Sequence, residues 1–146
     1  MTKVLEPIIK YYNKDIYYPS DDSYLILDYF KEKVVDNKIY KKLKQNVNYI
    51  LDMGTGLGLF AIFFAMFARS DKFFNPKIYA CDILEKALIY AQKNATFNQV
   101  EHDILFVLSD LFKNFSSDLK GKFDIIIFNP AVNEPVFFLN TPETHR

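Results

Sequence analysis

The first candidate for chemistry in this sequence is the glycine-rich stretch Asp52-Met53-Gly54-Thr55-Gly56-Leu57-Gly58. An apolar run, 47–51, leads into it, and a second apolar run follows it. Glycine has no Cβ, so three glycines permit a tight turn and let a ligand lie against bare backbone. The first N–H groups of a following helix would point at that ligand. The stretch therefore predicts strand, ligand-binding turn and helix; a tight turn that binds nothing is the simpler alternative.

The spacing of these glycines narrows the class of ligand. The dinucleotide-binding fingerprint needs a further glycine where this chain has Leu59. Asp52 also stands where a pyrophosphate would approach, and a carboxylate suits a ligand with an amino group better than one with phosphates. The stretch therefore argues against a nicotinamide-dependent dehydrogenase.

Polar residues follow three later apolar stretches at the point where each would end as a strand. Asp82 ends 77–82, Asp110 comes shortly after 104–108, and Asn129-Pro130 follows 123–128. An acid at the end of the second strand is where parallel α/β nucleotide folds hold ribose hydroxyls, and a carboxylate can accept from both hydroxyls. The alternatives stay open: Asp82 as a helix cap, Asp110 as a loop acid, and Asn129-Pro130 as a loop turn.

Alternation of strand-like and helix-like segments predicts how these groups are positioned. We expect strands at 47–52, 77–82, 104–108 and 123–128, and helices at 57–69, at 85–97 and after Ser20 or Asp21. Helix 57–69 is apolar nearly all round, which predicts cover on several sides. Strand 123–128 is continuously apolar, which predicts cover on both faces. The fold class is α/β, a doubly wound parallel sheet with the candidate groups at the carboxyl ends of its strands.

Composition limits the remaining possibilities. The chain has 146 residues, half of them hydrophobic, which we interpret as one domain over 1–146 with a real core. Its net charge of zero gives no general attraction to nucleic acid. The single cysteine, Cys81, lies in an apolar run and is expected to be a buried thiol. With no secretory signal and no apolar run of membrane-spanning length, we expect a cytoplasmic protein without a membrane partner, and we assign no metal ligands.

The stretch from Asp52 to Gly58 resembles motif I of the class I S-adenosylmethionine-dependent methyltransferases. The resemblance implies a Rossmann-like fold and S-adenosyl-L-methionine as cofactor. In that family the acid and the glycine turn receive the methionine end of the cofactor, the acid corresponding to Asp82 meets the ribose, and the acid corresponding to Asp110 meets the adenine amino group. The cofactor-binding residues implied are Asp52, Gly54, Thr55, Gly56, Gly58, Asp82, Ile83, Asp110, Leu111 and Asn129.

Two further stretches resemble a narrower group within that class. Tyr18-Pro19-Ser20-Asp21-Asp22-Ser23 is similar to the segment that opens the catalytic domain of HemK-type glutamine methyltransferases and borders the cofactor there, although Tyr18 replaces its usual Glu. Asn129-Pro130 resembles motif IV of methyltransferases that modify planar nitrogen. The resemblance implies that Asn129 and Pro130 are catalytic, because their carbonyl oxygens can accept N–H groups of the substrate. Ala131 and Val132 replace the second proline and the aromatic residue of that motif.

The resemblance covers about residues 16–132 and implies an N-methyltransferase of the HemK or small-domain type. Its expected substrate is a protein glutamine, as in a peptide-chain release factor. An RNA or DNA base N-methyltransferase is the alternative enzyme, and a truncated, inactive cofactor-binding or partner subunit is the alternative without activity. The family has further strands after motif IV, so we expect a partial domain that lacks the C-terminal strands, with strand 123–128 at an edge.

The expected partners follow from this partial domain. A strand edge left uncovered invites pairing with another chain. Some members of the family pair with a small zinc-binding activator protein. We therefore expect either such a subunit or self-association through the uncovered edge, and the apolar segment Val136-Phe137-Phe138-Leu139 would add exposed surface.

Overall fold

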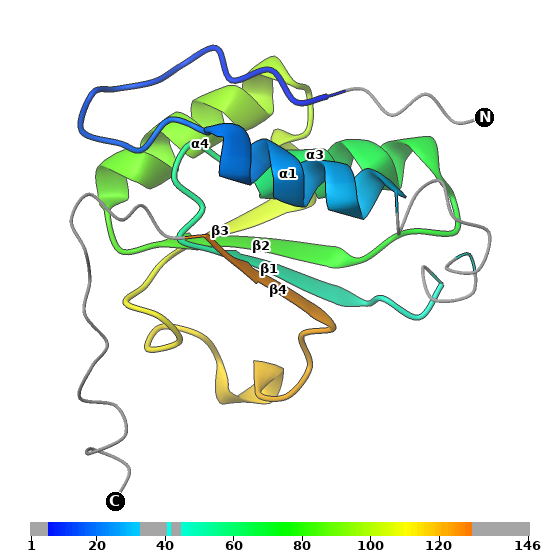
Figure 1. The fold of residues 1–146 in the computed structure, drawn as a ribbon. Helices are drawn as coiled ribbons and strands as arrows, with labels where there is room; N and C mark the ends of the chain where they lie inside the picture. Colours follow the sequence, from blue (N-terminus) through cyan, green and yellow to red (C-terminus); the bar gives the residue numbers. More distant parts are fainter. Residues whose placement is uncertain (1–5, 33–40, 42–44, 130–146) are drawn as a thin grey trace, which may run out of the picture.

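A computed structural model describes residues 6–32, 41 and 45–129, and they form a parallel sheet with helices packed on it (Figure 1). The sequence predictions for Pro130, Ala131, Val132 and the segment 136–139 lie outside the described residues. The predictions for Asn129 and for every other candidate residue lie inside them.

The sheet has four parallel strands in the order β3-β2-β1-β4. They are β1 (Tyr49–Met53), β2 (Lys77–Asp82), β3 (Ile104–Leu108) and β4 (Ile125–Phe128). The chain moves outward from β1 to β3 and then returns to the other side of β1, so the topological switch point lies between β1 and β4. In open α/β sheets this is where ligands bind. As predicted, β4 is an edge strand of the described sheet.

Three α-helices, α1 (Asp21–Phe30), α3 (Leu59–Ser70) and α4 (Glu85–Phe97), lie on the same side of the sheet (Figure 1). The connection from β3 to β4, which contains the short 3-10 helix η4 (Ser117–Leu119), lies on the other side. A second 3-10 helix, η3 (Glu101–Asp103), precedes β3. The Rossmann-like parallel sheet is therefore confirmed, and in its described part the α-helices cover one face.

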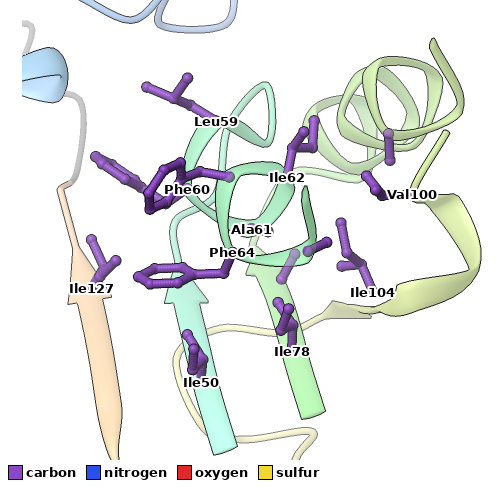
Figure 2. Packing of buried hydrophobic residues seen from close by; sticks show 14 of the residues in the cluster. Ile50, Leu59, Phe60, Ala61, Ile62, Phe64, Ile78, Val100, Ile104 and Ile127 are labelled. Carbon is purple, nitrogen blue, oxygen red and sulfur yellow. The ribbon is translucent and has the colours of Figure 1, made fainter. Parts of the chain in front are cut away.

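Helix α3 is the centre of the core. Its Phe64 lies near Ile50 of β1 and Ile127 of β4, and its Ile62 lies beside α4 (Figure 2). Phe60, Phe63, Phe64 and Phe67 are each at most 5% exposed. Phe30 of α1 also meets Phe64 edge to face, with ring centroids 5.2 Å apart. The prediction that this apolar helix is covered on several sides is confirmed.

Strand β4 differs from its prediction. Ile127 is buried against the core, but Ile126 and Phe128 are 50% and 55% exposed. Their side chains point away from the helices, because side chains alternate along a strand. Cover on both faces is therefore wrong for the described residues. On that face the β3–β4 connection packs Phe115 and Phe123 against Tyr79 of β2, the strand two places away from β4.

The strand register aligns the carboxyl ends at which the candidate groups were predicted. Met53 is paired with Cys81 on one side and with Phe128 on the other, and Asp82 is paired with Leu108. The residues that follow each strand therefore emerge at one edge of the sheet.

Candidate functional site

The glycine turn joins β1 to α3 in a conformation that suits glycine. Gly54, Gly56 and Gly58 have φ angles of +66°, +56° and +94°, all in the left-handed region. Between them, the Thr55 N–H donates to the carbonyl oxygen of Cys81 at 2.9 Å, which fixes the turn to the end of β2. A Cβ on Gly56 would meet nothing closer than 3.9 Å, so this part of the turn presents open backbone.

Gly58 has a different role from the other two glycines. A Cβ there would lie 3.2 Å from the Ala91 Cβ and 3.2 Å from the Ile62 Cδ1. The missing side chain thus allows α4 to approach the start of α3. Gly58 does not line the cavity described below, whereas Gly54, Thr55 and Gly56 do.

Asp52 is buried behind the turn, at 1% exposure. Its Oδ2 accepts from the Thr55 hydroxyl at 2.7 Å and from the Ala61 N–H at 3.1 Å, so the carboxylate caps the first turn of α3. Burial raises the pKa of this carboxyl to about 7, although both hydrogen bonds oppose the shift. The sequence led us to expect Asp52 beside the ligand. In the structure it lies beneath the glycine turn and is not among the residues that line the cavity.

Asp82 ends β2 and does line the cavity. Its Oδ2 accepts from the Gly56 N–H at 2.9 Å and its Oδ1 from the Leu84 N–H at 3.0 Å. Leu84 is the N-cap residue of α4, and no side-chain hydrogen bond caps that helix, so the helix cap predicted as an alternative is not formed. Each carboxylate oxygen of Asp82 keeps a second lone pair for another donor. Ile83 follows it at 63% exposure on the rim of the same cavity.

The residues after β3 form a second tight loop. Leu111 has a φ of +53°, and the buried Ser109 stabilises the loop by donating its hydroxyl to the Leu111 carbonyl at 2.7 Å and accepting from the Asn114 N–H at 2.9 Å. Asp110 and Leu111 both line the cavity. The Asp110 carboxylate carries an exposed ion pair with Lys113 at 2.8 Å.

Cys81 is the buried thiol that the sequence predicted. Its Sγ lies 3.5 Å from the carbonyl oxygen of Ser109 and 3.7 Å from that of Leu111. Burial raises the pKa of the thiol to about 11, and the carboxylates of Asp82 and Asp52 add to the shift. A thiol in this environment stays protonated and is a poor nucleophile.

Asn129 stands at the end of β4 on the opposite side of the turn from Asp82, and it lines the same cavity. Its Nδ2 donates to the Ser23 hydroxyl oxygen at 3.2 Å. Ser23 belongs to the segment that resembles the entry of HemK-type enzymes, and Ser23 and Pro19 also line the cavity. The structure therefore brings this segment to the site.

One part of the site was missed in the sequence. The segment 6–17 has no clear period, yet Asp15, Ile16 and Tyr17 line the cavity. Asn94 of α4 and Asn98, the residue at which this helix ends, hold the segment through its backbone. The Asn94 side chain exchanges two hydrogen bonds of 2.8 Å with the N–H and carbonyl of Tyr11 and donates to the Leu57 carbonyl at 3.1 Å.

Asn98, one helical turn further along α4, binds the N–H and carbonyl of Ile8 at 3.0 and 2.8 Å. The asparagines at positions 94 and 98, spaced i, i+4, were the available signal in the sequence. They lie on one face of a helix and can bind an extended backbone as a neighbouring strand would.

These elements enclose one cavity of about 400 Å³ at the switch point between β1 and β4. This volume falls in the range of small-ligand sites. Of the predicted residues, it is lined by Gly54, Thr55, Gly56, Asp82, Ile83, Asp110, Leu111 and Asn129. Among the described residues, no group of three or more His, Cys, Asp or Glu side chains is arranged to hold a metal ion. None of the helices described is both long and apolar enough to cross a bilayer.

The parallel sheet and the position of the cavity at its switch point are those of Rossmann-like α/β folds, which include the class I methyltransferases. The N-terminal domain of human METTL16 superposes on 84% of this chain and 46% of its own with a TM-score of 0.53 at 15% identity, which shows the shared fold. Residues 30–137 match the family described as "Methyltransferase small domain". This chain belongs to that family.

Similar relatives differ in what their names say they modify. The release factor glutamine methyltransferase of Flavobacterium psychrophilum is 33% identical over 120 residues, covering 82% of this chain and 37% of the relative. The tRNA1(Val) adenine-N6-methyltransferase of Salmonella arizonae is 34% identical over 101 residues, covering 69% of this chain and 39% of the relative. The chain spans about two fifths of the length of these two relatives.

Family membership supports S-adenosyl-L-methionine as the cofactor, and the cavity fits it chemically. The open backbone at Gly56 leaves room for a ligand to contact the turn. The free lone pairs of Asp82 suit hydroxyl donors, and the exposed acid Asp110 suits an amine. The carboxylates of Asp82 and Asp110 suit hydrogen-bond donors of this kind better than they suit phosphates.

Proposed function

We propose that this chain forms the cofactor-binding part of an S-adenosyl-L-methionine-dependent N-methyltransferase that acts on a planar nitrogen. One observation carries the proposal. Asn129, the residue that resembles the first residue of motif IV, lines the same cavity as the glycine turn and Asp82. An acceptor nitrogen bound at Asn129 would therefore lie beside the cofactor.

The residues have separable roles in this proposal. The turn from Gly54 to Gly56 holds the amino-acid end of the cofactor, and Asp82 accepts from its ribose hydroxyls. Asp110 accepts from the adenine amino group, with Ile83 and Leu111 as apolar walls. Asp52 and Gly58 act on the cofactor through the turn, since both lie outside the cavity lining.

Asn129 binds and orients the acceptor. Its amide carbonyl accepts an N–H of the acceptor nitrogen and so favours the build-up of positive charge on that nitrogen. When bound, the cofactor would supply an electrophilic sulfonium methyl group for this nitrogen and would leave as the neutral thioether, with the nitrogen proton released to solvent. Alignment of the two reacting atoms would supply most of the rate. The Pro130 carbonyl as a second acceptor stays a prediction.

A protein glutamine amide of the release-factor type is the acceptor we favour. The entry segment around Pro19 and Ser23 lies at the cavity, and the Flavobacterium relative carries that name. An RNA base is the second candidate, because the Salmonella relative is named for a tRNA adenine. The zero net charge favours the protein acceptor, since nucleic-acid enzymes usually present a basic face.

The alternative without catalysis is a cofactor-binding or partner subunit. The substitutions at Ala131 and Val132 favour it. The zinc-binding activator, self-association through β4 and a cytoplasmic location stay predictions from the sequence.

Two measurements on the full chain test the proposal. Isothermal titration with S-adenosyl-L-methionine and with NAD should show binding of the first alone; absence of binding at millimolar concentration would remove the cofactor role. Transfer of a labelled methyl group should then occur to a release factor rather than to tRNA, and Asn129→Ala should abolish it. Cofactor binding without transfer to either acceptor would establish the subunit without catalysis instead.

A further inference from the structure

The hydroxyl of Ser23 joins two elements that are far apart in the sequence. Ser23 lies in the first turn of α1 and is 3% exposed. Its Oγ accepts from the Asn129 Nδ2 at 3.2 Å, across 106 positions of sequence, and from the Ser20 N–H at 3.4 Å. The contact ties the start of α1 to the end of β4, beside the cavity that both residues line.

In this contact the nitrogen end of the Asn129 amide faces Ser23. An asparagine side chain has a carbonyl acceptor on one side and an NH₂ donor on the other. The N–H of an acceptor nitrogen must meet the carbonyl of Asn129, because the NH₂ group of Asn129 is itself a donor and cannot accept a hydrogen bond from it. Among the described residues, no hydrogen bond engages the Asn129 Oδ1, whereas Nδ2 is held by Ser23.

We propose that Ser23 is a positioning residue for methyl transfer, which holds the amide nitrogen of Asn129 and so presents the amide oxygen to the acceptor. The inference rests on the proposed function. Ser23 acts through Asn129 and needs no contact with the reacting atoms. Without its hydroxyl the amide could turn over, and part of the population would offer the wrong group to the acceptor.

The side-chain amide protons of Asn129 give a direct test that needs no activity. In ¹H–¹⁵N spectra of the full chain, this pair of resonances is assigned by its loss in Asn129→Asp. Hydrogen exchange of the pair should be slower than that of the exposed Asn75. Ser23→Ala should speed the exchange and shift the resonances, and Ser23→Thr should restore both because it keeps the hydroxyl. The matched control Ser116→Ala, which removes an exposed hydroxyl from the β3–β4 connection, should leave both as in the natural chain.

The rate of methyl transfer gives a second readout. With a release factor as acceptor, Ser23→Ala should lower kcat about fivefold to tenfold, the effect of one lost hydrogen bond, with a smaller change in KM for the cofactor. Ser23→Thr should recover kcat. A purely structural role of Ser23 would instead lower the amount of folded protein and leave kcat per folded molecule unchanged.

Several results would overturn the proposal. These are exchange at Asn129 as fast as at Asn75 in the natural chain, spectra unchanged by Ser23→Ala, or failure of Ser23→Thr to restore them. The first of these needs no Ser23 variant, so it applies even where Ser23→Ala does not fold. Failure of the proposed function is distinct, because it would remove methyl transfer while leaving the Asn129 resonances sensitive to Ser23.

Discussion

The buried carboxyl of Asp52 should make the stability of this chain depend on pH. It is 1% exposed and is bound by the Thr55 hydroxyl and the Ala61 N–H. Burial raises its pKa from 3.8 to about 7, the two hydrogen bonds lower it, and the charge of Asp82 raises it further. The prediction concerns Asp52→Asn, which removes the titration and keeps a carbonyl oxygen for one donor.

The sign of the effect follows from proton binding. Between pH 3.8 and about 7 the folded chain holds a proton on Asp52 that the unfolded chain has lost. The folded state therefore binds more protons, and the free energy of unfolding falls as the pH rises through this window. Roughly three pKa units correspond to about 4 kcal/mol in full, of which about 2–3 kcal/mol is lost between pH 5 and pH 8.

Urea denaturation of both chains at pH 5, 6, 7 and 8 measures this difference. The Asn variant should gain stability relative to the natural chain by about 2–3 kcal/mol between pH 5 and pH 8. Any fixed cost of placing the new NH₂ group is the same at every pH and cancels in the slope. Titrations elsewhere in the chain are common to both proteins. Parallel pH profiles would refute the reasoning and show that Asp52 ionises normally in the folded state.

Three further perturbations test the glycine turn, the cofactor contact and the N-terminal segment. Gly58→Ala should lower the free energy of unfolding by about 2–4 kcal/mol in urea titrations, because φ is +94° and the new Cβ would lie 3.2 Å from Ala91; unchanged stability would show that α4 can move away. Asp82→Ala should weaken the binding of S-adenosyl-L-methionine by about 1–3 kcal/mol in calorimetry, and an unchanged affinity would show that Asp82 is not part of the site. Asn94→Leu should speed hydrogen exchange around Tyr11, and continued protection there would show that other contacts hold the segment.

The sequence predicted the regular elements well where pattern and boundary signals agree. The predicted bounds of Lys77–Asp82, Glu85–Phe97 and Ile104–Leu108 coincide with β2, α4 and β3. Residues 104–108 are all apolar, 77–82 is an apolar run between Lys77 and Asp82, and 85–97 carries apolar residues at helical spacing. The helix predicted at 57–69 begins at Leu59 instead, because the turn continues through the left-handed Gly58.

Burial of the side chains was harder to predict from the sequence. The apolar run 123–128 indicated a strand covered on both faces. An apolar composition shows that a strand can be buried, but whether each face is buried depends on the elements that pack against it. Ile126 and Phe128 lie on a face to which no α-helix of the described chain contributes. The segment 6–17 was missed because its attachment beside α4 uses its backbone, which leaves no pattern in its own side chains.

The two acids at the turn show why residue type alone could not separate their roles. Both follow apolar strand residues, and both accept backbone N–H groups from the turn or the helix after it. They differ in how deeply they are buried. The Oδ2 of Asp52 accepts from Thr55 and Ala61 beneath the turn, whereas Asp82 lines the cavity and has lone pairs free for a ligand. Because these bonds form without a ligand, the turn is already ordered, and binding should cost little conformational entropy.

The cofactor and acceptor halves of the site depend on different parts of the chain. The turn, Asp82 and Asp110 follow β1, β2 and β3, and the turn also lies beside β4, since a Cβ on Gly54 would be 3.4 Å from the Phe128 ring. The acceptor half depends on Asn129 at the end of the edge strand, fixed to α1 by Ser23. We therefore expect cofactor binding to survive Asn129→Ala, the change that should abolish methyl transfer.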